Sequence, residues 1–129
     1  MSAYVDTNVL IRHITNDDVV HTPKAATLLH GERPLILTAS VFLETAHVLA
    51  STYGYPRDAV VQALKGILEL PAIIGDLDLL VSALQHHVRH RIGLPDAVLA
   101  ARALRDGPPV IASFDRELDR VPGVTRVTA

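Results

Sequence analysis

The sequence predicts an α/β protein in which helices cover both faces of a mainly parallel sheet of four to five strands, a three-layer α/β/α arrangement. Short apolar runs alternate along the chain with longer segments of helical periodicity. The short runs are apolar at every position, which is typical of parallel strands that are buried on both faces. A length of 129 residues without a long linker indicates one domain, residues 1–129.

The first half of the chain supplies two expected strands and four expected helices. Residues 3–5 form an apolar strand that ends at Asp6, and residues 10, 11 and 14 then share one helical face. Thr22-Pro23 is a favourable helix start, and residues 35–37 are a second strand. Residues 40–51 are a helix with Ser40 as the expected N-cap, and residues 57–70 carry a strong apolar stripe.

The second half repeats this alternation. Residues 72–74 are a short strand, residues 78–90 a helix, and residues 95–104 a helix that begins with proline. Residues 110–112 are the next strand, and the tail at residues 124–127 is expected to add one more.

Composition excludes several classes of protein. The absence of cysteine excludes a disulfide scaffold, a thiolate zinc site and a cysteine nucleophile, and it fits a reducing compartment, so we expect a cytoplasmic protein. No apolar run reaches the length of about 20 residues that spans a bilayer, and the first residues do not resemble a signal peptide. A net charge of −2 excludes a generally basic nucleic-acid binder, although an acidic pocket with a mildly basic surround is compatible with it.

Two carboxylates directly follow expected strands. Asp6 ends the first strand, and Asp115 follows the strand at residues 110–112. Ligands of open parallel sheets bind outside the carboxyl ends of the strands. If these two strands are parallel neighbours, both carboxylates lie at the same edge of the sheet.

Two further carboxylates lie on expected helices. Glu44 shares a helical face with Val41 and Val48, and a carboxylate buried on an apolar face needs a partner or a cation. Asp96 lies in the first turn of a helix whose following residues are almost all small and apolar. Taken singly, Asp6, Asp96 and Asp115 have ordinary explanations as turn residues or as charges at a helix N-terminus.

Together, the four carboxylates suggest a metal site. Hard oxygen ligands favour Mg²⁺ or Mn²⁺ over softer metals, and the carboxylates would repel one another without a cation. Such an ion can lower the pKa of a bound water and stabilise charge on a phosphoryl oxygen. This chemistry is that of phosphodiester hydrolysis.

The ordered motifs resemble those of PIN-domain nucleases. Residues 5–10, Val-Asp-Thr-Asn-Val-Leu, resemble the opening motif of that family. The later pieces follow in the family's order: Glu44 in a helix, Leu-Pro-Asp-Ala at residues 94–97, and Ser-Phe-Asp at residues 113–115. The resemblance covers essentially the whole chain, and a chain of this size is most similar to the VapC toxins of prokaryotic toxin–antitoxin pairs.

This resemblance implies an endoribonuclease that uses one or two Mg²⁺ or Mn²⁺ ions. It assigns the acidic quartet to Asp6, Glu44, Asp96 and Asp115. Asp6 and Asp96 would hold the principal ion, Asp115 would complete its shell or hold a second ion, and Glu44 would position the attacking water or bind the second ion. Asn8 and Ser113 match supporting polar positions. VapC-like proteins usually form homodimers and are inhibited by a small VapB-like antitoxin.

Other features have less specific interpretations. The segment at residues 86–91, His-His-Val-Arg-His-Arg, is expected to be a solvated helix face or helix end, with an RNA-contact strip as the alternative. Arg12 and His13 are expected to face water. One alternative function is a catalytically inactive PIN-like module that binds RNA or protein. Another is a phosphotransfer α/β domain, but Asn8 stands where a phosphatase would need a second aspartate, and Asp76 is only a weak candidate for the phosphate acceptor of a receiver domain.

Overall fold

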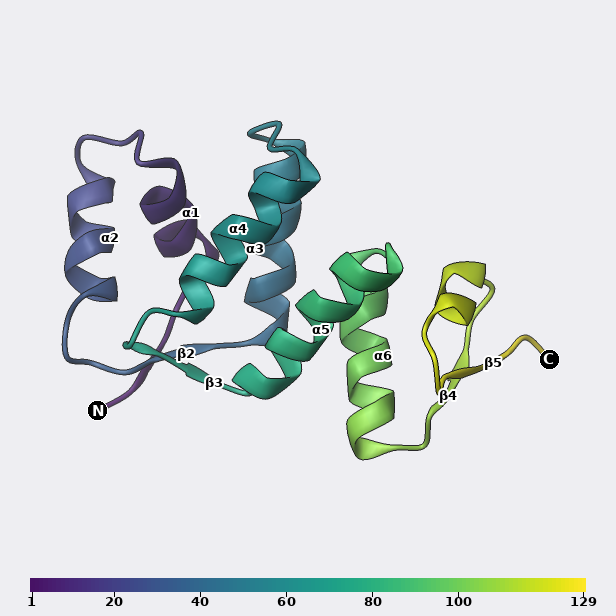
Figure 1. The fold of residues 1–129 in the computed structure, drawn as a ribbon. Coiled ribbons are helices and arrows are strands. Elements are labelled where there is room, and N and C mark those ends of the chain that lie inside the picture. The colour runs from purple at the N-terminus through teal and green to yellow at the C-terminus, as the bar shows by residue number, and fades with distance from the viewer. The chain divides into compact units, whose positions relative to one another are not determined.

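The structure is a computed structural model that describes all residues, 1–129, and these form two compact units, residues 1–77 and residues 78–129. Their strands and connecting helices are drawn in Figure 1. The prediction of an α/β protein with parallel strands is confirmed, because every strand pairing is parallel. The five strands form two sheets rather than one, a three-stranded sheet and a two-stranded sheet. The strands that precede Asp6 and Asp115 therefore lie in different sheets and are not paired neighbours. That residues 1–129 act as a single domain stays a prediction.

The first unit contains a three-stranded sheet with the order β1-β2-β3. Two helices connect each strand to the next, as parallel pairing requires a crossover. In chain order the elements are β1 (Ala3–Tyr4), α1 (Thr7–Thr15), α2 (His21–Leu29), β2 (Leu35–Leu37), α3 (Ala39–Ser51), α4 (Arg57–Leu68) and β3 (Ile73–Gly75).

The register of the sheet places Asp6 directly beyond its first strand. Tyr4 lies opposite Ile36, and the backbone N–H of Val5 donates to the carbonyl of Ile36 at 3.0 Å. The ladder therefore extends to Val5, which is buried, and the chain leaves the sheet at Asp6. Asp6 consequently lies at the carboxyl end of β1, as predicted.

Gly75 ends β3 in a conformation that a side chain would not tolerate. It pairs with Leu37 and has a φ of 137°, and a Cβ added there would lie 2.6 Å from the carbonyl oxygen of Leu37. Both the backbone conformation and the close approach of two strands therefore require glycine at this position.

We expect Gly75→Ala to lower the free energy of unfolding by about 2–4 kcal/mol, since backbone strain and overpacking act together. The matched control is Gly66→Ala in α4, where an added Cβ meets nothing within 4 Å. This control should raise stability by about 0.5–1 kcal/mol, because alanine is the better helix former. Urea unfolding of both variants measures the difference, and equal effects would contradict this account of Gly75.

The second unit contains a two-stranded parallel sheet, β4-β5, in which Ile111 pairs with Arg126. Two helices precede the sheet, and a short 3₁₀ helix lies between its strands. The elements are α5 (Leu77–His90), which starts at the last residue of the first unit, α6 (Leu94–Asp106), β4 (Val110–Ala112), η1 (Arg116–Arg120) and β5 (Thr125–Val127).

The core is aliphatic, as the low aromatic content predicts. Leucine, isoleucine, valine and alanine make up the buried apolar residues apart from Phe42. The longest helix, α5, has 14 residues, and none of the helices combines the length and the apolar character that a membrane span needs.

The predicted cap of α3 is wrong by two residues. The N-cap is Thr38, whose Oγ1 accepts the backbone N–H of Val41 at 3.2 Å. Because β2 already ends at Leu37, Thr38 is the residue that holds extended backbone between strand and helix. Ser40 is instead the second residue of the helix and is exposed.

Candidate functional site

Asp6 occupies the N-cap position of α1, but its side chain makes no capping hydrogen bond. The residue is exposed, and its backbone is extended, with φ −92° and ψ 153°. The ordinary explanation of Asp6 as a side-chain cap therefore does not describe what its carboxylate does. A carboxylate beside a helix N-terminus and outside a strand end is available to bind a cation.

Thr7 connects this motif to Glu44. Its Oγ1 donates to Oε2 of Glu44 at 3.0 Å, joining the first residue of α1 to the middle of α3. Thr7 is only 5% exposed, so the bond starts from a fixed position. Glu44 is 37 positions after Thr7 in the chain, and the fold thus brings it into contact with the residue that follows Asp6. Sequence reasoning missed Thr7, although its place directly after Asp6 is a signal.

The predicted burial of Glu44 is wrong, because Glu44 is exposed. The buried face of α3 is formed by Phe42, Thr45, Ala46 and Leu49, which are spaced by three and four residues. Val41 and Val48, which share the face of Glu44, are only half-buried. The carboxylate therefore lies where water or an ion can reach it.

Asn8 is exposed and lines a hollow of about 340 Å³ in the first unit, together with Arg12, Lys24 and Leu28. The predicted supporting role of Asn8 stays a prediction. Of the two polar residues that follow Asp6, Thr7 is the one that contacts a carboxylate.

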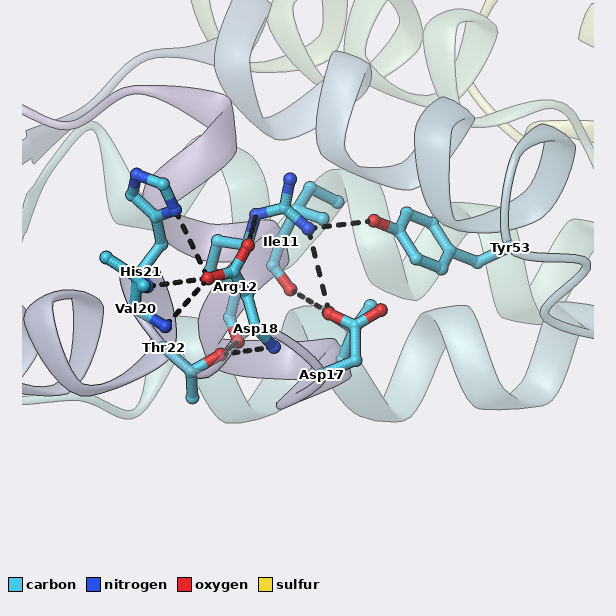
Figure 2. Close-up of polar contacts among 9 residues, drawn as sticks. Ile11, Arg12, Asp17, Asp18, Val20, His21, Thr22 and Tyr53 are labelled. Atoms are coloured by element: carbon cyan, nitrogen blue, oxygen red, sulfur yellow. Dashed lines mark hydrogen bonds and ion pairs between the residues drawn. The ribbon is translucent and has the colours of Figure 1, made fainter.

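The sequence predicts that Arg12 faces water, but in the structure its guanidinium contacts polar groups of the protein. Figure 2 shows its guanidinium among polar groups from three segments. It donates to the Tyr53 hydroxyl at 3.4 Å and lies 3.7 Å from Asp17 and 3.9 Å from Asp18. Asp18 also accepts the backbone N–H of His21 at 2.7 Å, and such backbone bonds hold the pKa of Asp18 below its usual range. This network ties α1 to the start of α2 and to the end of α3.

The second unit brings together three carboxylates. Asp96, Asp115 and Glu117 each offer an oxygen within 4.8 Å of the others. We call these three residues the acidic cluster. Asp96 lies in the first turn of α6, Asp115 is the N-cap of η1, and Glu117 is in the first turn of η1. The structure thus brings the predicted residues Asp96 and Asp115 together and adds Glu117.

Local hydrogen bonds build the turn that carries Asp115. Ser113 Oγ accepts the backbone N–H of Asp115 at 3.0 Å, and Asp115 Oδ1 accepts the backbone N–H of Glu117 at 2.9 Å. Glu117 Oε2 in turn accepts the backbone N–H of Gly93 at 3.3 Å, directly before α6. These hydrogen bonds to backbone N–H groups therefore fix the positions of Asp115 and Glu117, two of the three members of the acidic cluster.

Arg126 on β5 also stabilises this turn. Its guanidinium binds both carboxylate oxygens of Asp119, at 3.0 and 3.1 Å, and donates to the carbonyl of Ser113 at 3.1 Å. The bidentate pair with Asp119 raises the pKa of Arg126. The ion pair fixes η1 to β5, and the hydrogen bond to the carbonyl of Ser113 fixes the start of the turn.

Crowding of the carboxylates separates their pKa values. Burial, followed by the hydrogen bond and charge of Asp115 and the charge of Glu117, raises the pKa of Asp96 from its ordinary 3.8 to about 6. The pKa of Asp115 is lowered, first by the backbone N–H of Glu117 and then by the hydrogen bond with Asp96. Below about pH 6, Asp96 holds a proton that it shares with Asp115 through their hydrogen bond.

Glu117 was missed because the sequence predicts no helix after Asp115. The available signal was an acidic residue two positions after a candidate ligand. A short 3₁₀ helix that starts at Asp115 turns this spacing into proximity.

The histidine-rich segment at the end of α5 is partly structural. His87 is buried, and its Nδ1 lies 2.6 Å from the carbonyl of Ile92. His86 and His90 are half-buried with stacked rings, whereas Arg89 and Arg91 are exposed. Whether Arg89, His90 and Arg91 contact RNA stays a prediction.

The sequence matches the family model of the PIN domain over residues 3–124. No curated protein matches the chain. Because the match covers nearly all residues, the chain belongs to the PIN domain family, whose members are typically metal-dependent nucleases.

Proposed function

We propose that this PIN domain is a Mg²⁺- or Mn²⁺-dependent endoribonuclease that hydrolyses RNA phosphodiester bonds. The observation that carries the proposal is the acidic cluster, in which three carboxylates lie within 4.8 Å of one another in a chain of this family. The proposed site residues are Asp6, Glu44, Asp96 and Asp115, with Asn8 and Ser113 in support. That all four carboxylates serve one reaction centre stays a prediction.

The donors of the acidic cluster fit a hard divalent cation. All three offer carboxylate oxygens, which suit Mg²⁺ and Mn²⁺, and none offers nitrogen or sulfur. The raised pKa of Asp96 is a second sign of fit, because a bound cation would offset the repulsion by Asp115 and Glu117 that adds to the effect of burial on this group. When bound, the ion would supply an acidified water and neutralise charge on the phosphoryl oxygens.

The residues of the chain divide the remaining work. Asp6 and Asp96 would hold the principal ion, Asp115 would complete its shell or hold a second ion, and Glu117 would add negative charge beside Asp96 and Asp115. Glu44 would position the attacking water, act as its general base, or bind the second ion. Thr7 positions Glu44, since its hydroxyl uses one carboxylate oxygen and leaves the other free. Ser113 fixes the backbone of Asp115.

The biological role that we propose is that of a VapC-type toxin acting on cytoplasmic RNA. In this role a VapB-like antitoxin would inhibit the protein, which would act as a homodimer. The order of the acidic motifs along the chain supports this interpretation.

Purified protein should cleave a structured RNA in Mg²⁺ or Mn²⁺ and stop when EDTA is added. Internal cuts in a circular RNA would distinguish an endonuclease from an exonuclease. RNA binding without cleavage under both metals would instead favour the inactive-module alternative and overturn the proposed activity.

The toxin role has its own test. Expression of the chain alone should arrest bacterial growth, and co-expression with a small neighbouring open reading frame should relieve the arrest. Growth arrest that persists in an Asp6→Asn variant would contradict a toxic effect based on cleavage.

A further inference from the structure

Phe114 exposes an aromatic ring to solvent immediately beside the acidic cluster. The side chain is 87% exposed, whereas the other phenylalanine of the chain, Phe42, is fully buried. Solvation of so large an apolar group is unfavourable and contributes nothing to the fold. A single exposed apolar residue is common, so the argument for a function depends on how this ring is held and on its neighbours.

The ring projects from an ordered turn. The backbone of Ser113 is fixed on both sides: its N–H donates to the carbonyl of Val127 at 3.0 Å, and its carbonyl accepts from Arg126 at 3.1 Å. The N–H of Asp115 is bound by Ser113 Oγ. Phe114 thus lies between two tethered residues, so little backbone entropy remains to be lost when a ligand contacts the ring.

The residues next to Phe114 in the chain are polar and charged. Ser113 precedes it, and Asp115 and the exposed Arg116 follow it. Adjacent Cα atoms are about 3.8 Å apart, so the ring starts within one residue of a proposed metal ligand. The residues that flank the ring in the chain are charged or hydroxyl-bearing, whereas the centre of a protein interface is depleted of charge. A planar, uncharged base linked to a phosphate matches both the ring and the adjacent site.

We propose that Phe114 is a stacking platform for an unpaired RNA base next to the phosphate at the acidic cluster. The inference rests on the proposed function, since it takes RNA as the ligand. Single-stranded RNA is recognised through bases that stack on aromatic side chains, and stacking accepts every base because each has a π-face. Phe114 therefore selects single-stranded over paired RNA rather than one base over another.

A tryptophan variant provides a readout that does not require cleavage. The chain contains no tryptophan, so Phe114→Trp introduces a unique fluorophore at this position. Titration with a short single-stranded oligoribonucleotide in Ca²⁺ should quench the indole emission, and a blunt duplex of the same sequence should not. Binding is measured independently by the fluorescence anisotropy of a labelled oligonucleotide. If the oligonucleotide binds and the indole emission does not change, the proposal is overturned.

A substitution series separates stacking from general apolar contact. Phe114→Leu should weaken binding of the single strand by about 5- to 100-fold, while Phe114→Tyr should bind like wild type. An oligonucleotide with one abasic position should lose affinity for the wild-type protein but not for Phe114→Leu. Val19→Ala, which removes another exposed apolar side chain, is the control and should bind normally.

The outcomes distinguish this inference from the proposed function. If the wild-type protein cleaves RNA but Phe114→Leu binds and cleaves equally well, the stacking role is wrong and the nuclease stands. If the wild-type protein never cleaves, the nuclease proposal fails, and indole quenching still decides whether the ring stacks on RNA. Wild-type RNA binding by Phe114→Leu together with loss of binding to a protein partner would assign the ring to that partner and overturn the proposal.

Discussion

Asp6→Asn is expected to lower metal-dependent RNA cleavage by about three orders of magnitude while the protein stays folded. A metal ion contributes several kcal/mol to transition-state stabilisation, and each 1.36 kcal/mol corresponds to a tenfold change in rate. Asparagine keeps the shape of the side chain but removes its negative charge. Because Asp6 is exposed and its side chain forms no cap, its replacement removes no capping bond from the fold.

The measurement is the single-turnover cleavage rate at saturating Mg²⁺, with thermal unfolding as the check on folding. Asp58→Asn is the matched control, because Asp58 lies in the first turn of α4 and is also exposed. This control loses only a favourable interaction with a helix N-terminus, about 0.3–1 kcal/mol, and should cleave normally. A fully active Asp6→Asn variant would remove Asp6 from the mechanism.

The places of the strands could be predicted from the sequence because short apolar runs mark them, although β1 ends one residue earlier than predicted and β3 is shifted by one residue. Residues 35–37 and 110–112 were predicted with the bounds that the structure gives. Asp6 follows from the same logic, since a charged residue ends the apolar run at the edge of the sheet. Periodicity and strand ends therefore suffice to nominate the carboxylates Asp6 and Asp115.

Side-chain environments were harder to predict. The burial of Glu44 was wrong because α3 has two apolar stripes, and only the one through Phe42 is turned into the core. The cap of the same helix was wrong because the sequence offers Thr38 and Ser40 as equivalent hydroxyls. The structure selects Thr38, because α3 starts directly after it, and the apolar pattern does not fix the first residue of a helix.

The contacts of Thr7 and Glu117 depend on geometry that no pattern encodes. Thr7 reaches Glu44 across 37 positions of the chain. Glu117 joins Asp96 only because Asp115 starts a 3₁₀ helix and Gly93 donates to the Glu117 carboxylate. A linear sequence gives the types of these residues but not the turns that bring them together.

The pH dependence of stability should reveal the shared proton of the acidic cluster. The pKa of Asp96 is raised in the folded protein to about 6, so the folded state binds more protons than the unfolded state between its ordinary value and pH 6. Without metal, this group therefore makes the protein less stable as the pH rises through that window. Asp96→Asn removes the effect and should raise the melting temperature at pH 8 in EDTA by about 2–3 °C, a size discounted for solvent exposure.

Histidines act in the opposite direction as the pH rises toward their ordinary pKa of 6.5. The pKa values of His13 and His86 are lowered, mainly by burial, so these groups make the protein more stable as the pH rises. The difference between the profiles of the wild type and Asp96→Asn cancels the contribution of the histidines and isolates that of Asp96 together with its hydrogen-bonded partner Asp115. Asp58→Asn is the control, because it makes the same chemical change at an aspartate outside the acidic cluster.

A divalent cation should reverse the effect of Asp96. Mg²⁺ or Mn²⁺ competes with the shared proton, so its affinity should fall about tenfold for each pH unit below about 6. Above that pH, either ion should raise the melting temperature of the wild type and leave that of Asp96→Asn nearly unchanged. Equal stabilisation of both proteins by the metal would show that the ion binds elsewhere. A carboxylate that binds the cation in place of its proton cannot be replaced by an amide without loss of metal affinity.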